Sequence, residues 1–152
     1  MKKWAVLTLF CWLAGTCAAL AADLGALTYH GVRLGDAREA VLEQLGKPRA
    51  EIERTLDGKQ MLYYFYADDR VGLDLADGRV ADIRIVDRKF EAPGGVKLGA
   101  TTYKIFKEYG KAEKVRESGQ FYYVYRTADG ARVLLDVSAG HLEEIRLTNL
   151  AE

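Results

Sequence analysis

The sequence predicts an α+β fold of two tandem repeats, each a helix packed on a short antiparallel sheet, with the two sheets forming one continuous sheet. Residues 31–46 (GVRLGDAREAVLEQLG) are matched by residues 95–110 (GVKLGATTYKIFKEYG), which indicates two copies of one unit. A tyrosine-rich segment and a final hairpin follow each copy in the same order: YYFY (63–66) and YYVY (122–125), then LDLADGRVADIRI (73–85) and LDVSAGHLEEIRL (135–147). We therefore place the first repeat at 27–89 and the second at 90–150, which begins with the linker FEAPGG.

Residues 1–22 have the pattern of a secretory signal peptide. Lys2 and Lys3 supply the positive start, WAVLTLFCWLAG supplies the apolar stretch, and residues 19–21 supply the small residues of a cleavage site. We expect cleavage after Ala21 or Ala22, which predicts a periplasmic or secreted protein.

Two other uses of this segment stay open, and each would attach the chain to a membrane. The uncharged stretch from Trp4 to Ala22 is long enough to cross a bilayer if the signal is not cleaved. Cys17 could carry a lipid, although Thr16 breaks the spacing that lipidation requires.

The mature chain is expected to contain no cysteine, because Cys11 and Cys17 both lie in the signal segment. This excludes disulfides, thiol nucleophiles and thiolate metal sites. The 22 basic and 22 acidic residues balance, and loss of Lys2 and Lys3 leaves a net charge of about −2, as in ordinary soluble domains. No basic run occurs, so we expect no nucleic-acid partner.

Each repeat is expected to open with a helix. In the first, Asp36 and Glu39 form a capping box and Gly46 ends the helix. The matching positions in the second copy are Thr101 or Thr102, and Gly110. The apolar stripe comprises Ala37, Val41, Leu42 and Leu45 in the first helix and Ile105, Phe106 and Tyr109 in the second.

The remaining segments are expected to be strands separated by turns. They are EIERTL (51–56), QMLYYFYA (60–67), RVGLDLA (70–76), GRVADIRIVD (78–87), KVRES (114–118), QFYYVYRT (120–127), ARVLLDVS (131–138) and HLEEIRLTN (141–149). For both apolar sets of a final hairpin to face one side, its loop needs an odd number of residues. An odd loop pairs Leu73 with Ala81 and Val71 with Ile83, and in the second copy Val133 with Ile145.

The pattern Gly-Val-x-Leu-Gly, the helix ending in Leu-Gly-Lys-Pro, the tyrosine-rich strand and the strand DGRVADIRI resemble the SmpA/OmlA (BamE-like) superfamily, which includes outer-membrane assembly lipoproteins. A tandem pair of such units is similar in architecture to β-lactamase inhibitor protein. The resemblance covers nearly the whole mature chain and implies a non-enzymatic, envelope-associated binding scaffold. Those lipoproteins are single units on a lipidated cysteine, and the inhibitor protein has disulfides, so neither specific role is carried over.

Residues with catalytic chemistry are sparse. His30 precedes the first helix and His141 lies at a hairpin tip, where exposed structural histidines are expected. The sequence has no His-x-x-His pair, phosphate-binding glycine loop or nucleophile elbow. We therefore predict no catalytic residues, no metal site and no cofactor.

The sheet face away from the helices is the candidate binding surface. If the isoleucines of the last strands face the helices, the residues that alternate with them face outward. The candidate binding residues are Asp74, Asp82, Arg84, Asp136, Glu144 and Arg146, together with Tyr64, Tyr66, Tyr123 and Tyr125. Tyrosine and arginine anchor many protein interfaces. The same residues would also suit cross-strand pairs on a plain exposed sheet, and the opposite set of tyrosines could face outward instead.

These observations predict a non-enzymatic protein-binding scaffold of the bacterial cell envelope, whose partner is another envelope protein. The alternatives are a soluble carrier of a small ligand and an inhibitor of a secreted hydrolase. An enzyme, for example a hydrolase, is the third class, and the missing nucleophile and base argue against it.

Overall fold

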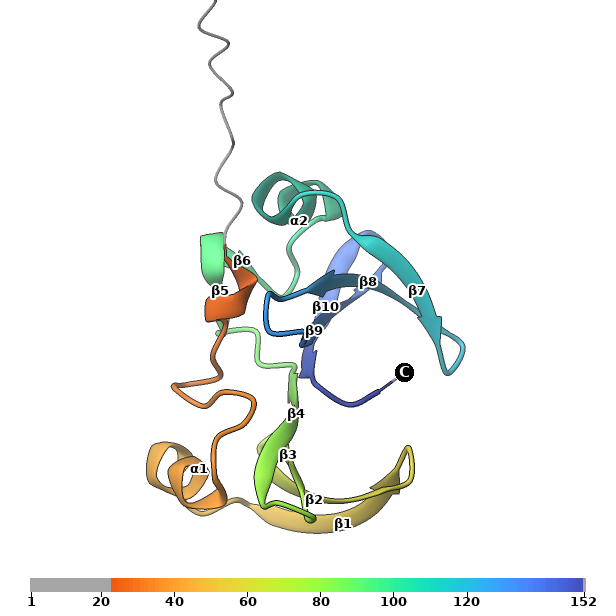
Figure 1. Cartoon of the computed structure of the whole chain (residues 1–152). Coiled ribbons are helices and arrows are strands. Elements are labelled where there is room, and N and C mark those ends of the chain that lie inside the picture. Colours follow the sequence, from red (N-terminus) through yellow and green to blue (C-terminus); the bar gives the residue numbers. More distant parts are fainter. Residues whose placement is uncertain (1–22, 152) are drawn as a thin grey trace, which may run out of the picture.

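The computed structural model describes residues 23–151 (Figure 1). The predicted signal peptide, its cleavage site and the lipidation alternative at Cys17 therefore lie outside the described residues. Within residues 23–151, no helix has the length and apolar character needed to cross a membrane.

Most of the described chain forms one antiparallel sheet. Its eight strands run in the order β1-β2-β3-β4-β10-β9-β8-β7. Their bounds are β1 Ala50–Leu56, β2 Lys59–Tyr66, β3 Asp69–Asp74, β4 Arg79–Ile85, β7 Glu113–Glu117, β8 Gln120–Arg126, β9 Arg132–Ser138 and β10 His141–Thr148. The other elements are α1 Arg38–Leu45, α2 Thr102–Tyr109, the short pair β5 Glu91–Ala92 and β6 Val96–Lys97, and the 3₁₀ turns Leu24–Ala26 and Pro93–Gly95.

The prediction of two tandem helix-on-sheet repeats is wrong. The last strand of each sequence repeat pairs directly with the other, so that Arg84 of β4 lies opposite Arg146 of β10 in the middle of the sheet. Neither half therefore has a sheet of its own, and the only α-helices among residues 23–151 are α1 and α2, of eight residues each. The molecule is mainly a single eight-stranded sheet with two short helices on it. The division at residue 90 stays a prediction from sequence alone.

The helix ends follow the sequence signals only in part. Gly46 and Gly110 end the two helices with φ of 74° and 80°, a conformation that glycine adopts without strain. Thr101 caps α2 by accepting a hydrogen bond from the amide of Lys104. Asp36 does not cap α1 because its carboxylate accepts a hydrogen bond from the amide of Arg33 instead, and Ala37 occupies the cap position.

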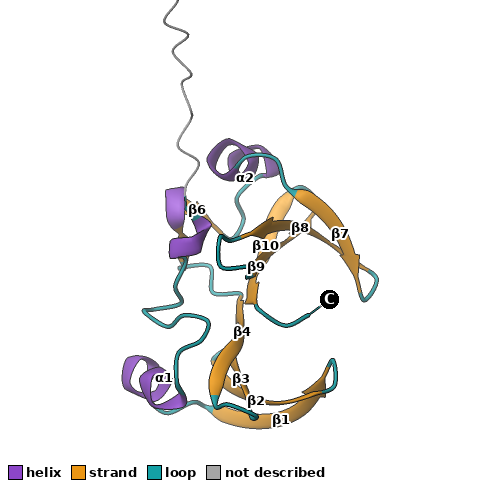
Figure 2. Cartoon of the chain, in the orientation of Figure 1, coloured by secondary structure: helices purple, strands orange, loops and turns teal. Residues whose placement is uncertain are grey.

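The sheet is strongly curved, with the helices on its convex side and the C-terminal segment inside its concave side (Figures 1 and 2). The main hydrophobic core fills the space between the convex side and the helices. Its fully buried members include Val41 and Ile105 from the helices and Ile83 and Ile145 from the central strands. Each such side chain stabilises the fold by about 1.5–3 kcal/mol through burial, which is enough to hold short helices on the sheet.

In the two final hairpins, bulges within the strands, and not odd loops, place both apolar sets on the same side of the sheet. In the β3–β4 hairpin the loop 75–78 is even, and Ala81 is bulged out so that Leu73 pairs with Val80. The β9–β10 hairpin has the even loop 139–140 and a register shift after Leu142, so that Val133 pairs with Leu147, not with Ile145. A bulge inserts one residue and changes the parity just as an odd loop would, which is why the apolar sets still face one side.

Candidate functional site

The concave side of the central strands carries four charged side chains, Asp82 and Arg84 of β4 and Glu144 and Arg146 of β10. Their neighbours in sequence on β4 and β10, among them Ile83 and Ile145, belong to the core beneath the helices. Strand alternation therefore points these four charged side chains away from the helices, as the sequence predicts. We call them the seam charges, because β4 and β10 join the two halves of the sheet.

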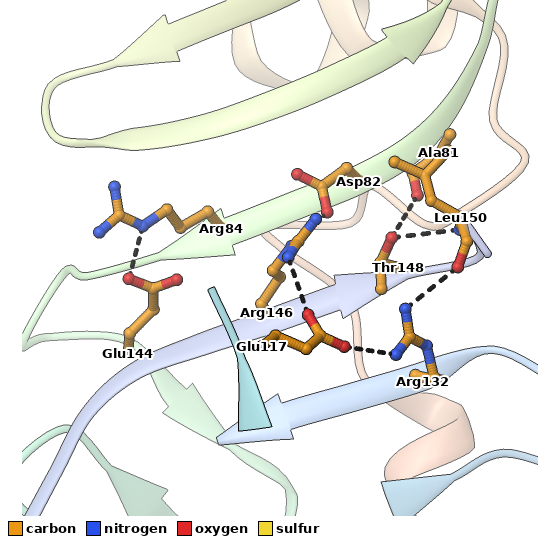
Figure 3. Close-up of polar contacts among 9 residues, drawn as sticks. All are labelled: Ala81, Asp82, Arg84, Glu117, Arg132, Glu144, Arg146, Thr148 and Leu150. Atoms are coloured by element: carbon orange, nitrogen blue, oxygen red, sulfur yellow. Dashed lines mark hydrogen bonds and ion pairs between the residues drawn. The ribbon is translucent and has the colours of Figure 1, made fainter. Parts of the chain in front are cut away.

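The seam charges form two ion pairs that cross from β4 to β10 (Figure 3). Arg84 Nε lies 2.5 Å from a carboxylate oxygen of Glu144, and Arg146 Nε lies 2.7 Å from Asp82. The Asp82 side chain is only 1% exposed, and the ion pair with Arg146 compensates for the water that its carboxylate loses on burial. Burial lowers the pKa of Arg146, but the charge of Asp82, their hydrogen bond and the charge of Glu117 outweigh it and raise the pKa overall.

The charged network continues across the second half of the sheet. Glu117 of β7 lies 2.7 Å from Arg132 of β9 and 3.8 Å from Arg146. Arg132 also donates a hydrogen bond of 3.2 Å to the carbonyl of Leu150, which ties the C-terminal segment into the concave side. Figure 3 shows these side chains in one continuous group above the strands. Sequence reasoning missed Glu117 and Arg132, because β8 lies between their strands in the sheet and no local pattern shows that their side chains meet.

The four tyrosines that we predicted for the open face lie on the other side of the sheet. Tyr64 is fully buried in the core, and Tyr66, Tyr123 and Tyr125 pack against it. The hydroxyl of Tyr66 donates to the carbonyl of Gly46, and that of Tyr125 to the carbonyl of Gly110. These tyrosines therefore fasten the sheet to the ends of the helices. The error arose because YYFY and YYVY are apolar or aromatic at every position, so alternation gives them no phase.

The opposite tyrosines, Tyr63 of β2 and Tyr122 of β8, face the concave side. Tyr63 packs with Met61, Ala81 and Leu150 in a second apolar cluster. Its ring lies over Gly72, where a Cβ atom would come within 2.6 Å of the ring. Tyr122 is half-buried, and burial followed by the charges of Glu144 and Asp136 raises its pKa.

Asp74 and Asp136 also follow the predicted alternation, but they lie outside the network of the seam charges. Asp74 pairs with Lys59 at 2.8 Å and accepts a hydrogen bond from the amide of Ala76 at the hairpin end of β3. Asp136 accepts a hydrogen bond of 2.8 Å from the side chain of Gln120. Both carboxylates therefore stabilise local turns and edges beside the central group.

Two hollows adjoin this region. A pocket of about 340 Å³ is lined by the ends of both edge hairpins, by Arg132 and Arg146, and by Ala151 of the C-terminal segment. A smaller pocket of about 170 Å³ lies between the segment 24–34 and the β8–β9 loop. Among the residues described, no group of three or more metal-binding side chains occurs.

Comparisons with known proteins show likeness in fold. No family model matches the chain, and no curated protein matches it. An extracellular protein containing an SCP domain from Bacillus anthracis is 12% identical with a TM-score of 0.58, over 76% of this chain and 43% of that chain. A cysteine-rich secretory protein from Staphylococcus aureus is 11% identical with a TM-score of 0.55, over 76% and 44%. The chain thus spans less than half of either protein.

A DUF4309 family protein from Bacillus subtilis matches over more of its length. It is 16% identical with a TM-score of 0.50, over 81% of this chain and 82% of that chain. A "putative beta-lactamase inhibitor protein" from Streptococcus mutans aligns with a TM-score of only 0.33, at 15% identity, which is too low to support an argument. At these identities the likeness concerns the fold alone, and no match supports the BamE-like superfamily specifically.

Proposed function

We propose that this protein is a secreted, non-enzymatic scaffold that binds another envelope protein through the concave side of its sheet. The observation that carries the proposal is the group of seam charges, held by ion pairs and flanked by Tyr63 and Tyr122 on a curved, well-packed sheet. The BamE-like resemblance of the sequence supports an envelope role.

The seam charges favour binding because they are already ordered. Arg84 and Arg146 are each fixed by a carboxylate, so their side chains lose little conformational freedom when a partner covers them. Arginine and tyrosine are enriched at the energetically important centres of protein interfaces. A concave sheet also surrounds a convex partner surface, which increases the area buried for a given number of strands.

The same arrangement argues against catalysis at this face. Asp82, Glu117 and Glu144 each contact an arginine at 2.7 Å or less. Carboxylates used in this way are acceptors within a structural network, whereas a general acid or base must reach a substrate proton. The secretory character of two structural neighbours and the signal-like residues 1–22 support export of the protein.

A carrier of a small anionic ligand is the second candidate. The pocket of about 340 Å³ beside Arg132 and Arg146 falls at the low end of the roughly 300–1,000 Å³ typical of small-molecule sites. A carrier would be stabilised against heat by its ligand in proportion to the logarithm of ligand concentration. A thermal-shift screen of small carboxylates and phosphates therefore distinguishes the two candidates.

The test of the scaffold is crosslinking in cells followed by mass spectrometry of the captured proteins. The variant Arg84→Gln/Glu144→Gln removes a whole ion pair, so no buried charge is left unpaired. Its control is Lys104→Gln/Glu108→Gln, which removes the ion pair of α2 on the convex side. We expect parent and control to capture the same envelope protein and the seam variant to lose it. Equal capture by all three would show that binding uses another surface.

A further inference from the structure

Three arginines from neighbouring strands lie directly opposite one another on the concave side. Arg70 of β3 pairs in register with Arg84 of β4, and Arg84 pairs with Arg146 of β10. Like charges opposite one another are unfavourable unless carboxylates neutralise them. Glu144 and Asp82 do so for Arg84 and Arg146. No residue between 23 and 151 forms an ion pair with Arg70.

Arg70 is held in place despite this lack of a carboxylate. Its guanidinium lies 5.4 Å from the ring centroid of Tyr63, a cation–π arrangement, and Phe65 lies opposite it on β2. Gly72 makes the arrangement possible, because the Tyr63 ring occupies the space that a side chain there would need. The Arg70 side chain is therefore oriented by its neighbours before any partner binds.

The hydrogen-bonding capacity of Arg70 is not used within the described chain. Its Nε is buried and has no hydrogen-bond partner. Burial and then the charge of Arg84 lower the pKa of Arg70, and the charges of Asp82, Tyr63 and Glu144 offset this only in part. An anion at the accessible part of the guanidinium would offset the adjacent positive charge of Arg84 and supply the acceptor that Arg70 lacks.

We propose that Arg70 is the point at which an acidic segment of the partner protein places an aspartate or glutamate carboxylate. This inference rests on the proposed scaffold function and specifies the chemistry of the partner. A carboxylate matches the planar fork of the guanidinium. Arg84 supports the same site, since it binds Glu144 through Nε while a terminal nitrogen is directed away from that carboxylate in Figure 3.

The surroundings favour a protein over a membrane as the source of the anion. Arg70 alternates with the core residue Val71 on β3, which directs it to the concave side, where it is half-buried over the Tyr63 ring. A flat bilayer surface cannot follow the curvature of the sheet in Figure 1. Phe65, which is partly exposed opposite Arg70, offers apolar contact to the side chains next to the acidic residue. The paired carboxylates nearby are neutralised by their own arginines, so they do not repel an acidic segment strongly.

The test uses a library of random twelve-residue peptides selected on the mature protein, followed by calorimetric titration of the enriched peptides. We expect these peptides to share an aspartate or glutamate. Arg70→Gln should weaken their binding at least about tenfold, as expected for a charged hydrogen bond. The control Arg54→Gln alters an exposed arginine of β1 on the same side and should change binding less than about twofold. Replacing the shared acidic residue by its amide should have no further effect in Arg70→Gln.

Folding is checked by thermal unfolding of each variant, and Arg70→Lys serves if Arg70→Gln does not fold. Lysine keeps the charge but lacks the fork, so we expect an intermediate loss of affinity. Enriched peptides without a shared acidic residue, or with unchanged affinity for Arg70→Gln, would overturn the inference while leaving the scaffold proposal in place. Failure to enrich any peptide would also overturn it, and capture in cells would then decide the scaffold proposal separately.

Further measurements show whether something other than an acidic peptide segment occupies the site. Binding to phosphatidylglycerol vesicles that depends on Arg70, without peptide binding, would assign the site to a lipid and overturn the inference. If inorganic phosphate binds in a way that depends on Arg70, and peptides do not bind, the site belongs to a free anion and the inference is overturned. A concentration-dependent dimer in sedimentation that Arg70→Gln abolishes would show that a second copy of this chain is the occupant.

Discussion

Asp82 on β4 and Arg146 on β10 form an ion pair of 2.7 Å across the strand pairing that joins the two halves of the sheet. Asp82 is almost completely buried, and Arg146 is only 19% exposed. The pair thus links a buried carboxylate to an arginine that reaches the surface of the concave side. Its removal should affect both stability and binding.

We predict that Asp82→Asn lowers the free energy of unfolding by about 3 kcal/mol, because it leaves Arg146 part-buried without its main partner. The double variant Asp82→Asn/Arg146→Gln should recover part of this loss, since neither charge then remains. Urea unfolding of the four proteins in the cycle measures the coupling. The control Lys97→Gln breaks the exposed pair with Glu91 and should cost less than about 1 kcal/mol. A cost for Asp82→Asn as small as that of the control would contradict the prediction.

The ion pair between Lys59 and Asp74 predicts a loss of stability in acid. The hydrogen bond from Lys59, and then that from Ala76, lower the pKa of Asp74 below its ordinary value. The folded pKa is therefore below the unfolded pKa of about 3.9, so the contribution is present above that value and is lost as the pH falls through the folded pKa. The stability difference between the parent and Asp74→Asn should shrink below about pH 4 in urea titrations. At pH 7, Asp68→Asn, an exposed turn variant, should match the parent in stability.

The raised pKa of Tyr125 predicts that the protein loses stability at alkaline pH. Burial raises its pKa to about 12, above the usual value of 10, so folding favours the neutral phenol. That contribution is fully present below about pH 10 and is lost as the pH rises toward 12. Tyr125→Phe also removes the hydrogen bond to Gly110, which should cost about 1 kcal/mol at pH 7. The difference in stability between the parent and Tyr125→Phe should narrow above pH 10. At pH 7, Tyr103→Phe, at a mostly exposed site, should match the parent.

We predict that a side chain at position 72 would collide with the Tyr63 ring, without any strain in the backbone. An alanine Cβ would lie 2.6 Å from Tyr63 Cε1, so the ring must move and its contact with Arg70 must change. We expect Gly72→Ala to cost about 1–3 kcal/mol, as overpacking does elsewhere. The smaller side chain in Gly72→Ala/Tyr63→Leu should remove the collision, so the two changes should be non-additive in denaturant unfolding. Additive losses would mean that the ring is not what limits the space.

The sequence was most informative where polar and apolar residues alternate strictly. This alternation placed Asp82, Arg84, Glu144 and Arg146 on the correct side of β4 and β10. It could not orient the tyrosine-rich strands, where successive residues are all apolar or aromatic. Loop length gave the correct pairing of Val71 with Ile83 but the wrong partners for Leu73 and Val133, because bulged residues alter the pairing within β4 and β10. No local pattern marks such a residue.

The sequence could not predict which charged residues of the two halves would meet, for a different reason. Arg84 and Arg146 become neighbours only through the pairing of β4 with β10, a contact between the last strands of the two sequence repeats. The repeat in the sequence suggested two units, but it contains no information on which strands meet. One continuous sheet was predicted, but the description as two helix-on-sheet repeats was wrong, since β4 and β10 pair in the middle of a single eight-stranded sheet.

The curved sheet does not close, and this leaves β1 and β7 as its outer edges. Their backbone amides and carbonyls on the outer side are a template for pairing with further chains, which would produce aggregates. Both strands carry charges along their length, with Glu51, Glu53 and Arg54 on β1 and Glu113, Lys114, Arg116 and Glu117 on β7. Addition of a second copy in register would bring like charges together and bury them at the junction. The charged edges thus protect an open sheet from fibril growth while its concave side remains accessible.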